Sequence, residues 1–338
     1  MITANLKIKN LIKFFLTINL LFVYNSIFAQ SENYKNYYEH IIKAQTLSYQ
    51  NKYESAIKEY DKAFSNAYAF PDDVIEAIKL HQKLKNQVKI NDLLKLLVES
   101  GYKPNNEIFV YIEEENQYFK HIKPTYISIP EYRKELDSIY NLYRKNNQLK
   151  IDASKDNYLS AFKAFEFFIT YARKFASIDE DESKSIYLQE VLWRSTKDLF
   201  LNLYHSGQDI DRQITDSWND ELFVNSLIHS AQVIDYRKDE YQKFLLEMVK
   251  QGNLHPYQFA VIIDDVERRS GNQQIYGTIN NAIEFDGDIE KYRNTQKQIA
   301  SIKDIEKVDE RRKEIFLPPL SVTAKKYNLK LPEDYKTK

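Results

Sequence analysis

The chain has 338 residues, no cysteine and a formal net charge of −1. The lack of cysteine excludes a disulfide framework and thiolate chemistry. The lack of a large basic excess argues against binding to phosphate backbones, so we expect no nucleic-acid partner. Glycine (6 residues) and proline (8 residues) are rare, and apolar residues recur at helical spacing, so the sequence predicts a mainly α protein.

Residues 1–29 are predicted to be a signal peptide. A start carrying three lysines leads into an apolar run from Phe14 to Phe28, and the small residue Ala29 follows it. A membrane span needs roughly 20 apolar residues, so this shorter run is typical of a secretory signal. The alternatives are an uncleaved anchor and a buried N-terminal helix. We expect an exported protein, periplasmic or secreted, with no stable membrane insertion after signal removal.

Residues 30–127 are predicted to form helical hairpins. The first two helices are expected to meet at a tight turn near Asn51, with small residues at positions 44, 56 and 63 that let them approach each other. The segment from Tyr49 to Phe64 resembles the second helix of a tetratricopeptide repeat. His40 departs from that pattern, because a large apolar residue is common there. The resemblance implies a surface for a protein or peptide partner.

A second, repeat-like unit follows. Pro71 starts a helix that Asp72 or Asp73 is expected to cap, and a partner helix is expected to run from residue 91 or 92 to residue 100. Two prolines then interrupt the chain and restrict the residues before them, which places a domain boundary near residue 127.

Residues 128–338 are predicted to form a second helical domain. Between residues 273 and 286 the apolar pattern changes from helical to alternating, and Asp286-Gly287 is a turn signal. We therefore expect a small β-hairpin inserted among the helices. The helices are expected over residues 131–145, 157–175, 182–204, 218–235, 238–250, 256–269, 289–298, 304–314 and 320–327.

A polar stretch from Gly271 to Thr278 is the main candidate for a site. Together with Asp264 before it and the V-D-E-R-R segment at 308–312, it resembles the signature of an uncharacterised bacterial domain family, G-x-x-Q-x-Y-G-T followed by V-D-x-R-R. The resemblance covers residues 220–327 and implies no particular activity. Two residues depart from the family pattern, Asp265 in place of an arginine and Ile279 in place of a glutamine.

The side chains around this stretch can bind a polar ligand or transfer protons. In that interpretation His229 or Asp264 is the general base and Arg312 holds an anionic group. The alternative is structural: a buried polar network that specifies the fold, with Asp309 and Arg312 paired on a helix surface. The candidate catalytic residues are His229, Asp264 and Tyr276, and the candidate ligand-binding residues are Gln274, Thr278, Asp309 and Arg312.

No known chemical motif decides between these alternatives. The sequence has no glycine-rich phosphate loop, no G-x-S-x-G elbow and no H-E-x-x-H helix, and its 6 histidines lack metal-ligand spacing. We therefore expect no cofactor and no metal, and whether the protein is an enzyme stays open. The first hypothesis is a helical module that binds a protein or peptide; the alternative is a small-ligand-binding or hydrolase-like C-terminal domain.

Overall fold

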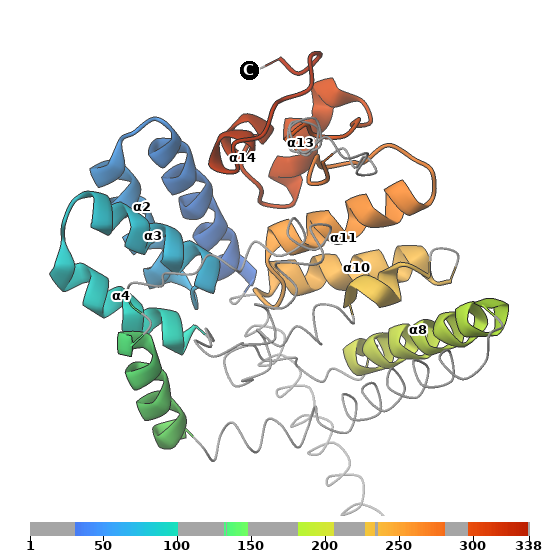
Figure 1. Ribbon diagram of the computed structural model, residues 1–338, viewed down its shortest axis with the longest axis horizontal. Helices are drawn as coiled ribbons and strands as arrows, with labels where there is room; N and C mark the ends of the chain where they lie inside the picture. The colour runs from blue at the N-terminus through green and yellow to red at the C-terminus, as the bar shows by residue number, and fades with distance from the viewer. Residues whose placement is uncertain are drawn as a thin grey trace, which may run out of the picture.

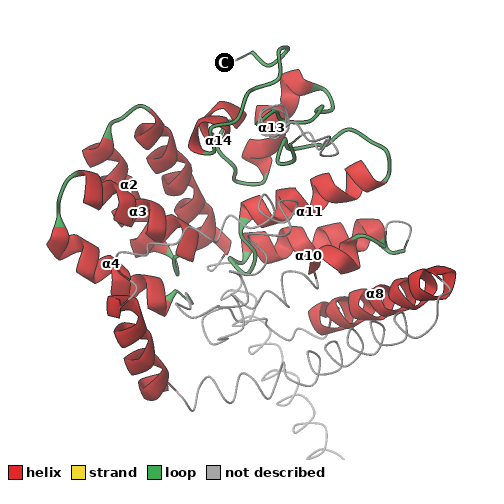
Figure 2. Cartoon of the chain, viewed as in Figure 1, coloured by secondary structure: helices red, strands yellow, loops and turns green. Residues whose placement is uncertain are grey.

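The computed structural model describes residues 31–100, 132, 134–147, 182–205, 227–233, 236–280 and 297–336. Within these ranges the protein is mainly α-helical, as the sequence predicts, and extended pairing is limited to isolated bridges (Figures 1 and 2). None of the described helices is long and apolar enough to cross a membrane. The predicted signal peptide and the domain boundary near residue 127 lie outside the described residues.

The helices follow the predicted order. Residues 31–49, 134–147 and 227–231 are helical. The remaining helices are α2 (Tyr53–Asn66), α3 (Pro71–Lys83), α4 (Gln87–Glu99), α8 (Glu182–His205), α10 (Lys238–Lys250), α11 (Pro256–Arg269), the 3₁₀ helix η2 (Ile305–Lys307), α13 (Val308–Glu314) and α14 (Leu320–Lys326).

The N-terminal helices form hairpins. Helix 31–49 turns into α2 at Asn51, whose φ of 60° is the left-handed conformation that asparagine tolerates. Ala44, Ala56 and Ala63 are fully buried, which lets the two helices pack closely. α3 packs against both α2 and α4. The predicted helical hairpins are therefore present, and their assignment to the tetratricopeptide repeat stays a prediction.

His40 forms an ion-pair contact where the repeat consensus has apolar packing. Its Nδ1 lies 2.8 Å from Oε2 of Glu59, and the ammonium groups of Lys43 and Lys62 lie 3.1 and 2.9 Å from Oε1. Burial raises the pKa of Glu59, but the hydrogen bonds from Lys62, His40 and Lys43 outweigh it and lower the pKa to about 2. Contacts between Glu59 and these three basic side chains therefore stabilise this part of the first hairpin.

The predicted caps of α3 and the predicted start of α4 are wrong. Phe70 is the N-cap of α3 and Pro71 its first residue, because proline has no N–H to satisfy and its φ suits the first helical turn. Asp72 and Asp73 therefore lie inside the first turn, where both are buried. α4 begins earlier than predicted because the Asn86 side chain accepts a hydrogen bond from the backbone N–H of Lys89 (3.3 Å) and caps it.

In the C-terminal half, α10 and α11 begin and end at the predicted residues, and α8 extends one residue further. α11 begins with a capping box: Nδ1 of His255 accepts from the backbone N–H of Tyr257 (3.1 Å), and Oε1 of Gln258 accepts from the backbone N–H of His255 (3.4 Å). The predicted helix 157–175 and most of the predicted helix 289–298 lie outside the described residues.

The segment 274–280 forms a bend with a bridge residue at each end. Gln274 forms a parallel bridge with Ile302, and Asn280 forms an antiparallel bridge with Ile299. Gly277 has a φ of +76°, and a Cβ there would lie 2.8 Å from Cδ1 of Ile302, so glycine is required for both conformation and space. The second half of the predicted β-hairpin, 281–286, lies outside the described residues, so the hairpin stays a prediction.

The N-terminal hairpins and the C-terminal half share one hydrophobic core, which extends from Tyr34 to Leu317. Helix 31–49 faces α10 and α11 (Figure 1). The Tyr38 hydroxyl donates to the carbonyl of Val249 (2.7 Å), and its ring stacks on Phe316 at 5.0 Å. Part of the surface of helix 31–49 is therefore covered by the chain's own C-terminal half.

Candidate functional site

Asp264 organises the bend that follows α11. It is fully buried. Its Oδ1 accepts from the backbone N–H groups of Ile275 (2.7 Å) and Tyr276 (2.8 Å), and its Oδ2 accepts from the N–H (2.9 Å) and the hydroxyl (2.7 Å) of Thr278. Burial raises the pKa of Asp264 and these hydrogen bonds oppose that rise. A carboxylate accepts about four hydrogen bonds, so these donors use its full capacity.

Gln274 ties the bend to the segment beside it. Its side-chain oxygen accepts from the backbone N–H of Ile279 (2.9 Å), and its side-chain nitrogen donates to the carbonyls of Ile279 (3.0 Å) and Ala300 (2.7 Å). Both ends of the amide are thus bound to backbone. The Gln274 side chain therefore adds to the backbone hydrogen bonds that join this segment to residues 300–303.

Two adjacent arginines hold the carbonyls of the same bend. Arg311 donates from Nε to the carbonyl of Ile275 (3.1 Å). Arg312 is fully buried, and it donates to the carbonyls of Tyr276 and Pro318 (2.7 Å each) and to the Thr323 hydroxyl. Burial lowers the pKa of Arg312, while nearby acidic groups oppose the change. Arg312 therefore points into the protein and does not form the expected surface pair with Asp309.

Asp309 binds the C-terminal segment. Its Oδ1 accepts from the backbone N–H of Leu320 (2.8 Å), the first residue of α14, and its Oδ2 accepts from the Tyr335 hydroxyl (2.8 Å). Tyr276 contributes its backbone to the bend, and its ring packs near that of Phe259, with 6.1 Å between centroids. Burial raises the pKa of the Tyr276 phenol to about 12.

His229 lies apart from these residues. Its ring stacks on Trp193 at 4.5 Å, and its Nδ1 is 3.1 Å from Oε1 of Gln232. Gln232 in turn donates to Asp265 (3.0 Å), which also accepts from Arg269 (2.7 Å). Successive residues of a helix point about 100° apart, so Asp264 and Asp265 bind different surroundings. The structure therefore brings together six of the seven candidates. The polar side-chain groups of five of them, Asp264, Gln274, Thr278, Asp309 and Arg312, bind the protein's own backbone and side chains.

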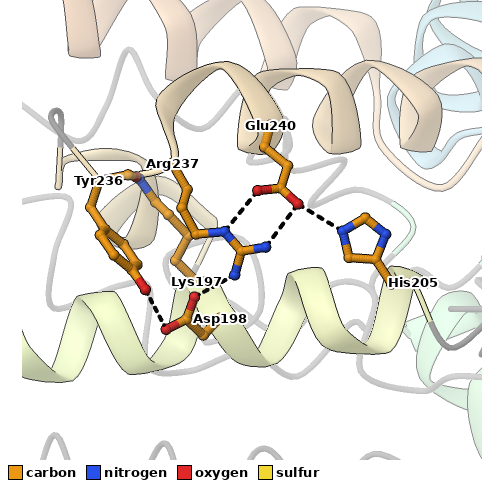
Figure 3. A network of polar contacts seen from close by, with 6 residues as sticks. All are labelled: Lys197, Asp198, His205, Tyr236, Arg237 and Glu240. Atoms are coloured by element: carbon orange, nitrogen blue, oxygen red, sulfur yellow. Dashed lines mark hydrogen bonds and ion pairs between the residues drawn. The ribbon is translucent and has the colours of Figure 1, made fainter.

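A second polar network joins α8 to the start of α10 (Figure 3). Arg237 binds both Asp198 (2.6 Å) and Glu240 (2.7 Å), and His205 lies 2.8 Å from Glu240. Lys197 is buried and donates to the carbonyls of Val233 (2.8 Å) and Tyr236 (2.9 Å). Burial lowers the pKa of Lys197 to about 8. Each acid of this network has a cationic partner, which fits a structural link between two helices.

A pocket lies where the N-terminal hairpins meet the C-terminal half. The volume that a water-sized molecule can occupy in it is about 40 Å³. Helix 31–49, the first turn of α3, the start of α11, the loop before α14 and the end of α14 all contribute to it. Its lining includes Tyr38, Asp72, Asp73, Tyr257, Phe316 and Tyr327.

The two carboxylates of this pocket differ in their partners. Asp73 accepts from the Tyr37 hydroxyl (2.7 Å), and its Oδ2 lies 3.9 Å from Nε2 of His255. Asp72 is 6% exposed, and its Oδ1 has no hydrogen-bond partner in the part of the chain that the structure describes. Burial raises the pKa of Asp72, Lys326 opposes this rise, and Asp73 and Glu76 add to it; the resulting pKa is about 7.

His255 cannot serve as a base in this arrangement. Its Nδ1 accepts the hydrogen bond that caps α11, so Nδ1 carries no proton, and the neutral ring has its N–H at Nε2, facing Asp73. Thr323, also in the lining, accepts from Arg312 with its hydroxyl. The sequence analysis missed this pocket because it assigned Asp72 and Asp73 to helix capping. The sequence did contain one indication: Asp72 and Asp73 are adjacent, and a helix cap needs only one of these two carboxylates.

Compared with protein-family models, with curated proteins and with solved structures, the chain matches none. The resemblance of residues 220–327 to an uncharacterised bacterial family therefore stays a prediction.

Proposed function

We propose that this protein is an exported helical binding protein, and that its site is the pocket between the N-terminal hairpins and the C-terminal half. One observation carries the proposal: Asp72 lines the pocket, and its Oδ1 is enclosed and has no hydrogen-bond partner among the described residues. A buried polar atom without a hydrogen bond costs free energy. A ligand that donates to the Asp72 carboxylate as the side chain turns toward the pocket would remove that cost.

The contacts in the pocket support binding more than catalysis. A base or nucleophile needs a free lone pair within reach of the substrate. Nδ1 of His255 is used by the cap of α11, and Asp73 is held by Tyr37. Asp72 is left as a candidate base, but no nucleophile among the described residues is hydrogen-bonded to its Oδ1. The alternative site around Gln274, Tyr276 and Thr278 has the same difficulty, because its central carboxylate, Asp264, already accepts four hydrogen bonds.

The pocket also fits the hypothesis of an interaction module in a modified form. Tyr38 and Asp72 come from the hairpins, whereas Tyr257 and Tyr327 come from the C-terminal half. A ligand in the pocket would contact both parts at once. We therefore propose that the partner inserts a small group between the two parts and does not lie along an open groove.

A fragment screen by ligand-observed NMR tests this proposal. The screen uses cationic, neutral and anionic fragments on the exported chain and on a variant that fills the pocket, Gln45→Trp. The control is Val88→Trp, because Val88 is 75% exposed on α4 and lies outside the pocket lining. Fragments that bind the pocket lose their signal with Gln45→Trp and keep it with Val88→Trp. A screen in which no fragment behaves in this way overturns the proposed function.

A further inference from the structure

We propose that residues 325–327 at the end of α14 act as a pH-sensitive latch on α3, which stays closed while the Asp72 carboxyl group is protonated and opens as that group ionises. The inference goes beyond the proposed function, because it concerns the fold itself and its test needs no ligand. It depends on three features of the described residues: the acidic groups that begin α3, the enclosed oxygen of Asp72, and the polar contacts of the latch.

The first two turns of α3 place three acidic side chains against the C-terminal half. Asp72 and Asp73 are buried, and Glu76 follows one turn later. In helix 31–49 the hydroxyl of Tyr37 donates to Asp73 (2.7 Å), whereas that of Tyr38 donates to a backbone carbonyl. Oδ1 of Asp72 is enclosed and has no hydrogen-bond partner among the described residues. Because a charged oxygen without a donor is costly to enclose and two acids lie nearby, the closed latch favours the neutral form of Asp72.

Lys326 is the cation that the latch brings to these acids. Its Nζ lies 3.6 Å from Oε1 of Glu76, which also binds Lys79 of α3 (3.1 Å). Burial acts to raise the pKa of Glu76, but the two lysines lower it overall. Lys326 also opposes the rise in the pKa of Asp72, but burial outweighs it. Near neutral pH, Glu76 therefore keeps its charge and holds Lys326, while Asp72 changes its charge.

Other titratable groups also face the acids of α3. His255 at the start of α11 lies 3.9 Å from Oδ2 of Asp73. Histidine commonly changes charge near neutral pH, so its contribution has to be separated from that of Asp72. Burial raises the pKa of three nearby phenols, which therefore stay neutral at about pH 8; they belong to Tyr60 in α2, Tyr257 in α11 and Tyr327 in the latch.

The latch is able to open without breaking either apolar cluster. Two buried residues of α14 belong to the second cluster and precede the latch, namely Leu320 and Ala324. The latch contacts the hairpins through polar groups: Lys326 binds Glu76, and Lys325 donates to the carbonyl of Tyr49 (3.0 Å). Partly exposed polar contacts break at a lower cost than buried apolar ones. Local opening therefore costs less than unfolding of the whole chain.

The sign of the effect follows from the two states of Asp72. Its pKa is about 7 in the closed structure, and its ordinary value is 3.8, which it regains once water reaches it. Ionisation therefore favours the open state increasingly as the pH rises from about 4 to about 7. Between about pH 6 and about pH 8 the open state gains about a hundredfold from ionisation and the closed state about tenfold, so the ratio of open to closed molecules rises about tenfold.

Labelling of single introduced cysteines measures this ratio, because the chain has no cysteine of its own. Ile41→Cys places a thiol at a buried position in the lining of the pocket, to which Lys326 and Tyr327 of the latch also belong. Val88→Cys replaces a residue that is 75% exposed and gives the rate for a free thiol at each pH. Leu245→Cys, at a fully buried position on α10, reports unfolding of the main core. Each buried rate divided by the Val88→Cys rate gives the open fraction.

We expect the open fraction from Ile41→Cys to rise about tenfold between about pH 6 and about pH 8, and to exceed that from Leu245→Cys at both. Adding Asp72→Asn should remove the rise, because the amide does not ionise. Adding Asp92→Asn, at an exposed position on α4, should leave it unchanged. Adding Lys326→Met should increase the open fraction about tenfold at both pH values, because Glu76 loses its partner in the latch.

Four results would overturn the latch. A rise that persists with Asp72→Asn assigns the effect to another group, of which His255 is the first to test. Equal open fractions from Ile41→Cys and Leu245→Cys at each pH mean that the whole protein unfolds and no local contact opens. An unchanged open fraction with Lys326→Met means that the end of α14 does not hold the contact closed. Unfolding of Asp72→Asn also contradicts the latch, because asparagine imitates the neutral carboxyl group.

Discussion

Replacing Asp264 with asparagine tests whether the polar cluster around the bend is structural. In the native protein Oδ1 of Asp264 accepts two backbone N–H groups and Oδ2 accepts the N–H and the hydroxyl of Thr278, all within 2.7–2.9 Å. In Asp264→Asn the best orientation turns Nδ2 toward Thr278, whose hydroxyl then rotates to accept from it. The N–H of Thr278 loses its partner in a buried site.

The cost follows from these contacts. The unpaired N–H of Thr278 costs about 1–3 kcal/mol, and the hydrogen bonds to Ile275 and Tyr276 lose their charge. Arg312, fully buried nearby, also loses a negative neighbour. Removing the desolvation of the carboxylate offsets part of this, so we expect a net loss of about 3 kcal/mol.

Thermal unfolding followed by circular dichroism measures this loss. For a chain of this size about 3 kcal/mol lowers the midpoint by about 4–5 °C. Asp92→Asn is the matched control, because that carboxylate is exposed, and its midpoint should stay within about 1 °C of the native value. An unchanged midpoint for Asp264→Asn would refute the structural interpretation and return Asp264 to the list of candidate catalytic residues.

Three further predictions concern burial, charge and close contact. Folding raises the pKa of Asp72 from 3.8 to about 7, so this group lowers stability increasingly as the pH rises from about 4 to about 7. Asp72→Asn should therefore raise the thermal midpoint at about pH 8 and leave it nearly unchanged at about pH 4. Glu59, with its pKa lowered to about 2, stabilises the fold above about pH 4.5 and loses this effect as the pH falls toward about 2. Since its lysine partners are exposed, Glu59→Gln should cost only about 1–2 kcal/mol at neutral pH. Gly252 and Gly271 have φ of +74° and +77°, but only at Gly252 would a Cβ overlap a side chain, lying 2.0 Å from the Tyr34 ring. Gly271→Ala should cost about 1 kcal/mol and Gly252→Ala about 2–4 kcal/mol.

Each of these predictions has a result that contradicts it. If Asp72→Asn lowers the midpoint at about pH 8, a protein group satisfies Asp72 and the pocket proposal loses its main support. If acid unfolding of Glu59→Gln follows that of the native chain, the ion pairs of Glu59 contribute nothing measurable. Equal costs for the two glycine variants would mean that helix 31–49 does not pack against the end of α10.

The sequence was sufficient for the elements whose signals are local. The bounds of α10 and α11 were predicted correctly because apolar periodicity and a starting proline act within a few residues. The prediction failed at the start of α3, where Asp72 and Asp73 have the side chains of cap residues but lie beyond Pro71. Capping propensity depends only on residue type, whereas the position of the cap was set by Pro71, which is the first residue of the helix and makes Phe70 the N-cap.

The candidate residues around the bend were also found from the sequence, but their roles were not. The sequence shows that Asp264, Gln274 and Arg312 are polar and closely grouped, whereas only the fold shows that all three bind backbone atoms. Side-chain identity sets the capacity to form hydrogen bonds. The partners of those bonds depend on which segments meet, and this cannot be seen from spacing along the chain.

What the sequence by itself determined is therefore the helical class, the bounds of α8, α10 and α11 to within one residue, and the polar composition of the bend, since each depends on neighbours along the chain. Only the tertiary structure decided that helix 31–49 packs on the C-terminal half and that Asp72 lies in the pocket between them. Asp72 and Tyr327 are far apart in sequence and meet because apolar burial drives the two halves together. The packing of the two halves buries Asp72 and leaves its Oδ1 without a hydrogen-bond partner among the described residues.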